Sequence, residues 1–134
     1  MRSLQPPGWP EPRGYANGIE AHGLVFTGGM IGWDKTGAFP HADLAGQVGQ
    51  ALENVVAVLA EAGARPEDVV RLTWYIADRE EYLAHTREIG AAYREVMGRH
   101  FPAMAVIEVS GLLETQAKVE IEATAVLRAD SASG

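Results

Sequence analysis

The strongest constraint in this chain is a strict two-residue alternation near its C-terminal end. In residues 118–127, KVEIEATAVL, valine, isoleucine, alanine and leucine occupy every second position, and lysine, glutamate and threonine lie between them. Successive side chains of a β-strand point to opposite faces of its sheet, so this segment predicts a strand with one apolar and one acidic face. The rest of the chain must therefore supply a layer that covers the apolar face.

Two other segments alternate in the same way, residues 69–77 and 103–112. Taken with the first, they predict a mixed outer face that no helix covers and that is either solvated or used as a subunit contact. We expect this face to carry the following side chains: Arg71, Thr73, Tyr75, Met104, Val106, Glu108, Glu120 and Glu122. Arg71 is expected to pair there with Glu108 or Glu122.

The pairing of the last two strands decides how far apart their side chains lie. If residues 103–112 and 118–127 form an antiparallel hairpin, Met104 and Glu120 lie about six residues apart along the ladder. At about 3.3 Å per residue this is roughly 20 Å. One subunit alone would then be unable to bring both side chains to one small ligand.

Helix signals lie between the strand candidates. Apolar residues recur at three and four positions from Asp43 to Ala62, and a second such pattern follows Asp78 and stops at Gly98. Two short strands are expected within residues 15–31, interrupted at Gly28 and the glycine that follows it. The predicted fold is α+β, in the order ββαβαββ, with two helices packed on one face of a mixed sheet.

Length and composition limit the possible classes of protein. A chain of 134 residues predicts a single domain, here residues 15–127, after an extended Pro-rich segment, 1–14, and before a flexible tail, 128–134. The chain shows no signal-peptide pattern and no apolar run of membrane-spanning length, so no membrane partner is expected. It contains no cysteine, which fits a cytoplasmic location.

Charge and motif searches argue against several kinds of site. The net charge of −7 disfavours nucleic acid, because phosphate binding needs a basic surface. The four histidines form no metal-ligand spacing, and the GGMIG stretch lacks the pattern of a phosphate loop, so neither a metal nor a cofactor is expected.

Several stretches resemble the Rid family, the reactive intermediate (enamine/imine) deaminases also described as endoribonuclease L-PSP and YjgF-like proteins. The resemblance runs from about Tyr15 to Leu127, and its most specific part is FPAMAVIEVSGL together with KVEIEATAV. Supporting stretches are GYANGI, VFTGGMIG, AEAGA and VVRLTWYIAD. The resemblance implies a chorismate-mutase-like fold and a homotrimer with a small-molecule cleft at each subunit interface.

The resemblance also implies roles for individual residues. Tyr15 and Glu120 match cleft positions, and Glu120 is expected to orient a water molecule. Other cleft positions differ from the family pattern: Met104 replaces the carboxylate-binding arginine, Gly28 a serine, Met30 a glutamine and Val106 a cysteine. A thioether has no charge and no fork of donors, so Met104 is unable to hold a carboxylate. Trp33, in a turn beside the expected cleft, is either a lid or a cover for the core.

Three functions remain open from the sequence. The first is hydrolysis of an imine, enamine or similar activated small molecule, with release of ammonia, by a subgroup that lacks the arginine. The second is a non-catalytic trimer that binds a small molecule or a protein. The third, RNA cleavage, follows only from the older family description and is disfavoured by the acidic charge.

Overall fold

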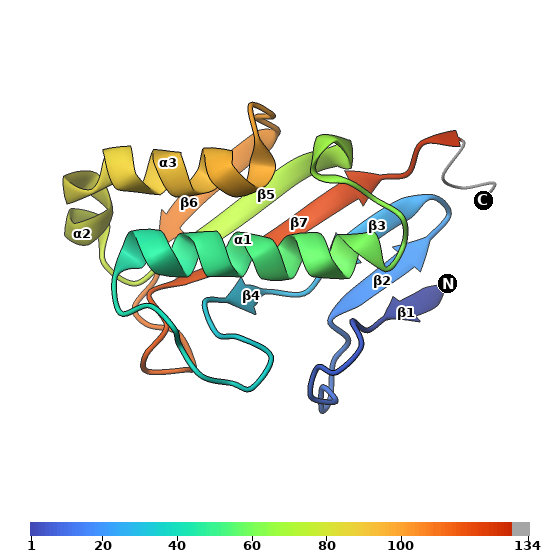
Figure 1. Cartoon of the computed structure of the whole chain (residues 1–134), viewed down its shortest axis with the longest axis horizontal. Helices are drawn as coiled ribbons and strands as arrows, with labels where there is room; N and C mark the ends of the chain where they lie inside the picture. Colours follow the sequence, from blue (N-terminus) through green and yellow to red (C-terminus); the bar gives the residue numbers. More distant parts are fainter. Residues whose placement is uncertain (130–134) are drawn as a thin grey trace.

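In the computed structural model, which describes residues 1–129, one seven-stranded sheet lies behind three α-helices (Figure 1). The strands are β1 (Arg2–Leu4), β2 (Gly18–Ala21), β3 (Leu24–Thr27), β4 (Met30–Ile31), β5 (Val69–Ile76), β6 (Ala103–Glu108) and β7 (Val119–Val126). The helices are α1 (Leu44–Ala60), α2 (Arg79–Ala84) and α3 (Thr86–Met97), with a 3-10 turn η1 (Pro66–Asp68). No helix within these 129 residues is long and apolar enough to cross a membrane. Most of the predicted tail, residues 130–134, lies outside the described part of the chain.

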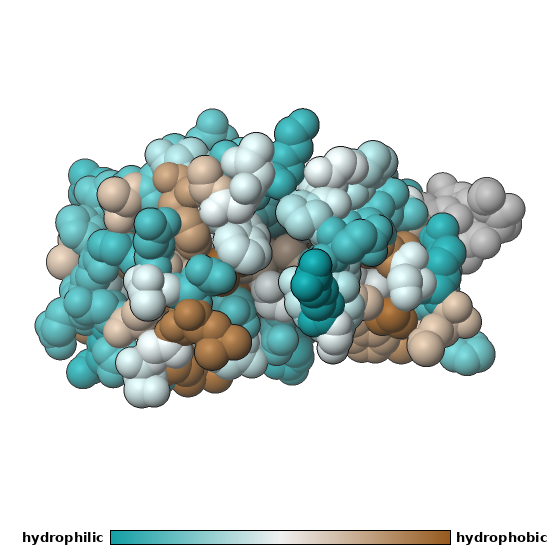
Figure 2. Space-filling model, turned by 90° about the horizontal axis from the view of Figure 1, so that it is seen from below, coloured by the Kyte–Doolittle hydropathy of each residue, from teal (hydrophilic) through white to brown (hydrophobic). Residues whose placement is uncertain are grey.

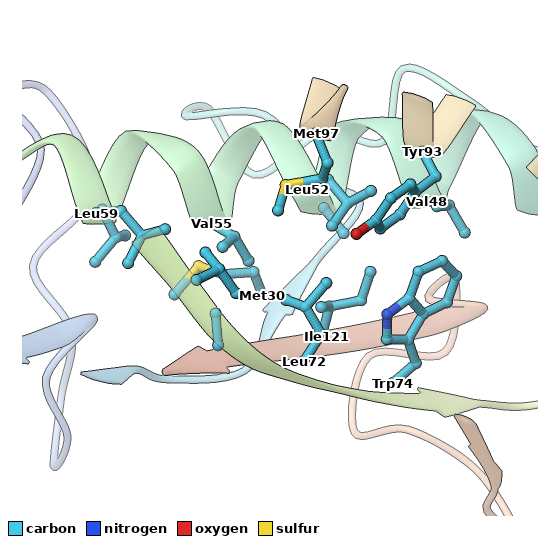
Figure 3. Close-up of a cluster of buried hydrophobic side chains, with 14 of the residues drawn as sticks. Met30, Val48, Leu52, Val55, Leu59, Leu72, Trp74, Tyr93, Met97 and Ile121 are labelled. Atoms are coloured by element: carbon cyan, nitrogen blue, oxygen red, sulfur yellow. The ribbon is translucent and has the colours of Figure 1, made fainter. Parts of the chain in front are cut away.

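The alternating segment becomes the central strand of the sheet. β7 pairs antiparallel with β5 on one side and with β3 and β4 on the other. Its odd-numbered residues from Val119 to Ala125 are buried. Helix α1 lies across this face and presents Val48, Leu52 and Val55 to it (Figure 3). The predicted apolar face of residues 118–127 is therefore the floor of the core.

The boundaries of α1 follow from ordinary capping chemistry. The Asp43 carboxylate accepts a hydrogen bond from the Gly46 backbone N–H, which satisfies one free donor of the first turn. Gly63 follows the helix with φ +77, a conformation that glycine adopts without the strain a Cβ would bring. The sequence prediction for this helix is confirmed to within two residues at its C-terminal end.

The second predicted helix is two helices. Asp78 caps α2 through the N–H groups of Glu80 and Glu81, but His85, with φ −129 and ψ 30, breaks the helix before α3 begins. The Glu81 carboxylate binds the Lys118 ammonium at 2.6 Å. Gly98 ends α3, as predicted.

An aromatic stack joins the helices to the sheet. The Trp74 ring on β5 stacks on Tyr93 of α3 with centroids 6.2 Å apart, and Tyr93 stacks on Phe101 at 5.6 Å (Figure 3). The Tyr93 hydroxyl donates to the His100 carbonyl at 2.6 Å. These contacts fix the turn that leads from α3 into β6.

The predicted pairing of the last two strands is wrong. β6 runs parallel to β5 at the edge of the sheet and does not touch β7. In this register Met104 lies opposite Leu72 and Val106 opposite Trp74, so both point to the face covered by helices. The open face of β6 instead carries Ala103, Ala105 and Ile107. The α2–α3 crossover imposes this result, since two strands joined through helices on one face pair in parallel.

The N-terminal segment is part of the sheet. β1 pairs antiparallel with β2, and Leu4 is buried in the core. The Pro-rich stretch that follows is not extended throughout: it turns at Pro7 and Gly8, where the Trp9 N–H donates to the Pro6 carbonyl, and it runs beside the loops at the lower edge of Figure 1.

The Gln47 side chain joins two loops to α1. This side chain is 1% exposed; its amide donates to the His41 and Gln116 carbonyls at 3.1 and 3.0 Å, and its oxygen accepts from the Lys118 N–H at 2.8 Å. It therefore sets where the loop before α1 and the loop before β7 lie, and both loops lead toward the site described below.

We predict that Gln47→Met lowers the free energy of unfolding by at least about 2 kcal/mol, because it keeps most of the volume and leaves buried polar groups unpaired. Urea denaturation measures the loss. The matched control is Gln50→Met, which removes one partly exposed hydrogen bond to Asn54 and should cost less than about 1 kcal/mol. Equal losses for the two variants would contradict the role given to Gln47.

Candidate functional site

A pocket of about 440 Å³ opens at the lower edge of the sheet, next to β4. Figure 2 views this side from below and shows a hollow near the middle, bordered by polar side chains. Six segments line it: residues 9–17, the β4 region, the 33–37 loop, Asn54 of α1, residues 113–114 and the N-terminal half of β7. Its lining includes Trp9, Glu11, Tyr15, Asn17, Gly29, Met30, Ile31, Trp33, Asp34, Lys35, Asn54, Leu113, Glu114 and Glu120.

Glu120 lies at the sheet end of this pocket. Its backbone pairs with Ile31 of β4 and with Tyr75 of β5. Burial raises the pKa of the Glu120 carboxyl above its ordinary value, and the neighbouring Glu122 charge raises it further. Glu120 is thus a partly buried acid whose proton affinity is shifted toward neutral pH, as general bases require.

The absence of a side chain at Gly29 makes room for the Glu120 carboxyl. A Cβ at position 29 would overlap the Glu120 carboxylate, so only glycine leaves room for it beside the β3–β4 connection. The predicted interruption of the strand at the two glycines is confirmed, and its function is this close approach.

Glu122 is held apart from the pocket. Its carboxylate accepts a hydrogen bond from the Tyr75 hydroxyl at 3.0 Å, and this bond raises the pKa of Tyr75. The two glutamates of β7 therefore have different tasks: Glu122 is engaged by a neighbour, whereas Glu120 faces the pocket.

Two asparagines hold the aromatic walls of the pocket. Asn17, 8% exposed, donates to the Gln5 oxygen at 2.8 Å, and the Gln5 amide donates to the Trp9 carbonyl at 3.3 Å. Asn54 of α1 donates to the Ile31 and Trp33 carbonyls at 2.9 and 2.8 Å. Each tryptophan-bearing loop is thereby tied to the fold through amide hydrogen bonds.

The structure gathers four of the seven residues predicted for the site. Tyr15, Met30, Trp33 and Glu120 line the pocket, with Tyr15 61% exposed at its rim. Trp33 packs against Phe39 with centroids 6.2 Å apart and forms a wall of the pocket.

The other three predicted residues lie outside the pocket of their own chain. Gly28 packs beside the Ala16 carbonyl, where a Cβ would lie 3.1 Å from the oxygen. Met104 and Val106 are on the helix-side face of β6, and Met104 is 39% exposed. Met104 and Glu120 point to opposite faces of the sheet and lie three residues and two strands apart. The two side chains are therefore separate within one chain, although the strand pairing that separates them differs from the predicted hairpin.

Sequence reasoning missed Trp9, Asn17 and Asn54. Trp9 lies in a Pro-rich segment without periodicity. Asn17 and Asn54 are single polar residues that lie next to or within apolar patterns. The sequence did contain a signal for Asn54. A side-chain amide on the buried face of an amphipathic helix needs a hydrogen-bond partner, and loop carbonyls are common partners.

The expected ion pair of Arg71 is absent from the described residues. Glu108 lies on the opposite face of the sheet and accepts the Arg79 N–H at 2.7 Å. Glu122, which shares the face of Arg71, is engaged by Tyr75. Within residues 1–129, no cluster of three His, Cys, Asp or Glu side chains could hold a metal ion.

The fold and the pocket have counterparts among known proteins. The family model described as endoribonuclease L-PSP matches residues 10–127. The chain belongs to this family, the Rid family. It is 35% identical over 118 residues to the 2-iminobutanoate/2-iminopropanoate deaminase of Escherichia coli K12, a match that covers 85% of this chain and 88% of the relative.

Solved structures confirm the architecture of this Rid-family member. The YjgF gene product of E. coli superposes with a TM-score of 0.82 at 32% identity, over 96% of this chain and 100% of that one. E. coli TdcF, crystallised with bound serine, gives 0.82 at 29% identity over the same shares. The predicted chorismate-mutase-like fold is confirmed.

We predict that the Glu120 carboxyl titrates above the ordinary glutamate value of 4.5 and that Glu122→Gln lowers its midpoint only part of the way back. The larger cause of the shift is burial, which that substitution leaves in place. Carbon-detected NMR of the side-chain carboxyls follows both midpoints. A full return to the ordinary value in Glu122→Gln would show that charge repulsion, not burial, dominates.

The same shift has a consequence for stability. A raised pKa means that the folded chain holds this proton more tightly than the unfolded chain, so the contribution of Glu120 is largest at acid pH and is lost as pH rises through the raised value. The amide in Glu120→Gln does not titrate in this range. The free energy of unfolding of this variant should therefore increase relative to that of the wild type from about pH 4 to neutrality.

Proposed function

We propose that the protein hydrolyses an imine, enamine or similarly activated small molecule in the pocket beside Glu120, with release of ammonia. The observation that carries this proposal is the Glu120 carboxyl itself, which has a raised pKa and faces a pocket large enough for a small ligand. Its relatives support the choice: one is named as an imine deaminase, and another binds serine in its crystal structure.

The chemistry needs a base beside an electrophilic carbon. The ionised Glu120 carboxylate accepts a proton from a water molecule while the water oxygen bonds to the imine carbon, and the C=N electron pair moves to nitrogen. Glu120 then returns this proton to the nitrogen, and as the C–N bond breaks its carboxylate accepts the proton of the new hydroxyl, which leaves a carbonyl compound and ammonia. Gly29 leaves room for the carboxylate at the pocket, and Tyr15 lies at the rim, where it can bind substrate.

We predict that freshly generated imines release ammonia faster with the wild-type protein than without it, and that Glu120→Gln lowers this acceleration at least about 100-fold. The rate should rise with pH through the raised pKa of Glu120, because the base must be ionised. The matched control is Glu53→Gln, an exposed position of α1 that loses the same charge outside the pocket. A flat result across a varied panel would favour the alternative, a non-catalytic binding protein.

We further infer that the working unit is a homotrimer in the cytoplasm. β6 is an edge strand whose outer side has no partner within residues 1–129; it carries Met104 and Ile107 exposed, and Met104 is remote from the Glu120 of its own chain. A neighbouring subunit would let Met104 of one chain border the pocket of another. The acidic charge and the acidic pocket disfavour RNA as a substrate.

We predict that the wild type hydrolyses 2-iminopropanoate poorly and that Met104→Arg raises this rate about tenfold or more. A guanidinium supplies two charge-assisted hydrogen bonds to a carboxylate, each worth about 1.5 to 3 kcal/mol before desolvation, and about 1.4 kcal/mol is tenfold in rate. Met104→Gln, of similar length without the charge, is the control.

Two results would contradict this shared site. One is a stable monomer in analytical ultracentrifugation. The other is wild-type activity on 2-iminopropanoate that Met104→Arg does not increase. Gly28→Ser is a natural companion change, but the Ala16 carbonyl has to move a few tenths of an ångström to admit it, so the single variant is tested first.

A further inference from the structure

The pocket beside Glu120 has an excess of negative charge. Four carboxyl side chains line it, those of Glu11, Asp34, Glu114 and Glu120, against the one ammonium of Lys35. Hydrogen bonds from Thr36 lower the pKa of Asp34, so this group is fully ionised at neutral pH. The negative potential of the pocket would therefore repel a ligand that carries a carboxylate.

Aromatic rings form the other part of the lining. Trp9 and Tyr15 come from the β1–β2 connection and Trp33 from the loop after β4; they share the pocket with the apolar side chains of Ile31 and Leu113. The faces of indole and phenol rings attract cations, and they also cover flat apolar groups. Since Asn17 and Asn54 fix the loops that bear the two tryptophans, this lining is formed before a ligand arrives.

We propose that the substrates are protonated imines that carry an aromatic or branched apolar group and no carboxylate. Imines formed by oxidation of primary arylalkylamines are of this kind. This inference rests on the imine hydrolysis proposed above. The positive nitrogen is stabilised by the carboxylates, and the apolar group lies against the rings. The balanced reaction is R₂C=NH₂⁺ + H₂O → R₂C=O + NH₄⁺. Neither oxidant nor metal enters it.

Binding tests the charge preference directly with two planar ligands of the same size. Benzamidine is a stable cation that resembles a protonated imine, and benzoate is its anionic counterpart. We expect benzamidine to bind at least about tenfold more tightly than benzoate by calorimetry. It should also change the fluorescence of Trp9 and Trp33, whereas Trp74, 2% exposed in the core, provides the unchanged background.

Two variants with the same change in net charge show whether the pocket is responsible. Glu120→Gln should weaken benzamidine binding severalfold, and Glu53→Gln, outside the pocket, should leave it unchanged. If benzoate binds as well as benzamidine, or if the two variants behave alike, the proposed charge preference is overturned.

Turnover provides the second test with a pair of substrates that differ only in the carboxylate. An amine oxidase acting on 2-phenylethylamine and an amino-acid oxidase acting on phenylalanine generate the two imines, and ammonia release is followed with and without the protein. We expect at least about tenfold greater acceleration for the imine that lacks the carboxylate.

The outcomes separate this inference from the proposed function. Equal or faster hydrolysis of the phenylalanine-derived imine overturns the substrate class and leaves imine hydrolysis standing. Selective benzamidine binding with no turnover of either imine overturns the hydrolysis and leaves the cation preference standing.

Discussion

The two faces of β7 are the constraint on which the rest of the structure depends. Val119, Ile121 and the alanines that follow are locked beneath α1, so Glu120 and Glu122 must point to the other face. At about 3.3 Å per residue the two carboxylates start less than 7 Å apart, and β4 pairs with β7 beside the first. The raised pKa of Glu120 is therefore a product of the core packing: a one-residue slip would bury the glutamates in the core and expose the isoleucine.

Periodicity revealed which residues of each strand share a face, but not which strands are neighbours. The segment 69–77 and the apolar face of 118–127 were predicted correctly, and α1 was predicted almost to its ends. The error concerned β6, which was placed beside β7 in a hairpin. Two signals were available against that choice: a helical crossover of more than 20 residues favours a parallel pair, and the ten-residue connection from Glu108 to Val119 is too long for a tight hairpin. The mistake moved Met104 and Val106 to the wrong face.

Part of the pocket could not be predicted from the sequence, and the reason is physical. Tyr15 and Glu120 could be named because the chain resembles a family, and the glycine pair could be recognised because it breaks a strand. Trp9 and the amides of Gln5 and Asn17 belong to a segment with no periodic pattern, and their role depends on hydrogen bonds between residues up to 12 positions apart. Such contacts exist only after β1 has paired with β2, which brings Gln5 beside Asn17.

The raised pKa of Glu120 and the absence of an arginine are parts of one electrostatic arrangement. Burial raises the pKa of the Glu120 carboxyl, and this pKa also responds to the charge of whatever binds beside it. An anionic ligand, with no guanidinium to neutralise it, would raise that pKa further and leave Glu120 in the form that is unable to accept a proton. A cationic imine would lower the pKa of Glu120 and so favour the carboxylate that the proposed hydrolysis needs. In the proposed reaction, the absence of a guanidinium at Met104 would therefore do more than weaken the binding of carboxylates: the charge of the substrate would set the ionisation of Glu120.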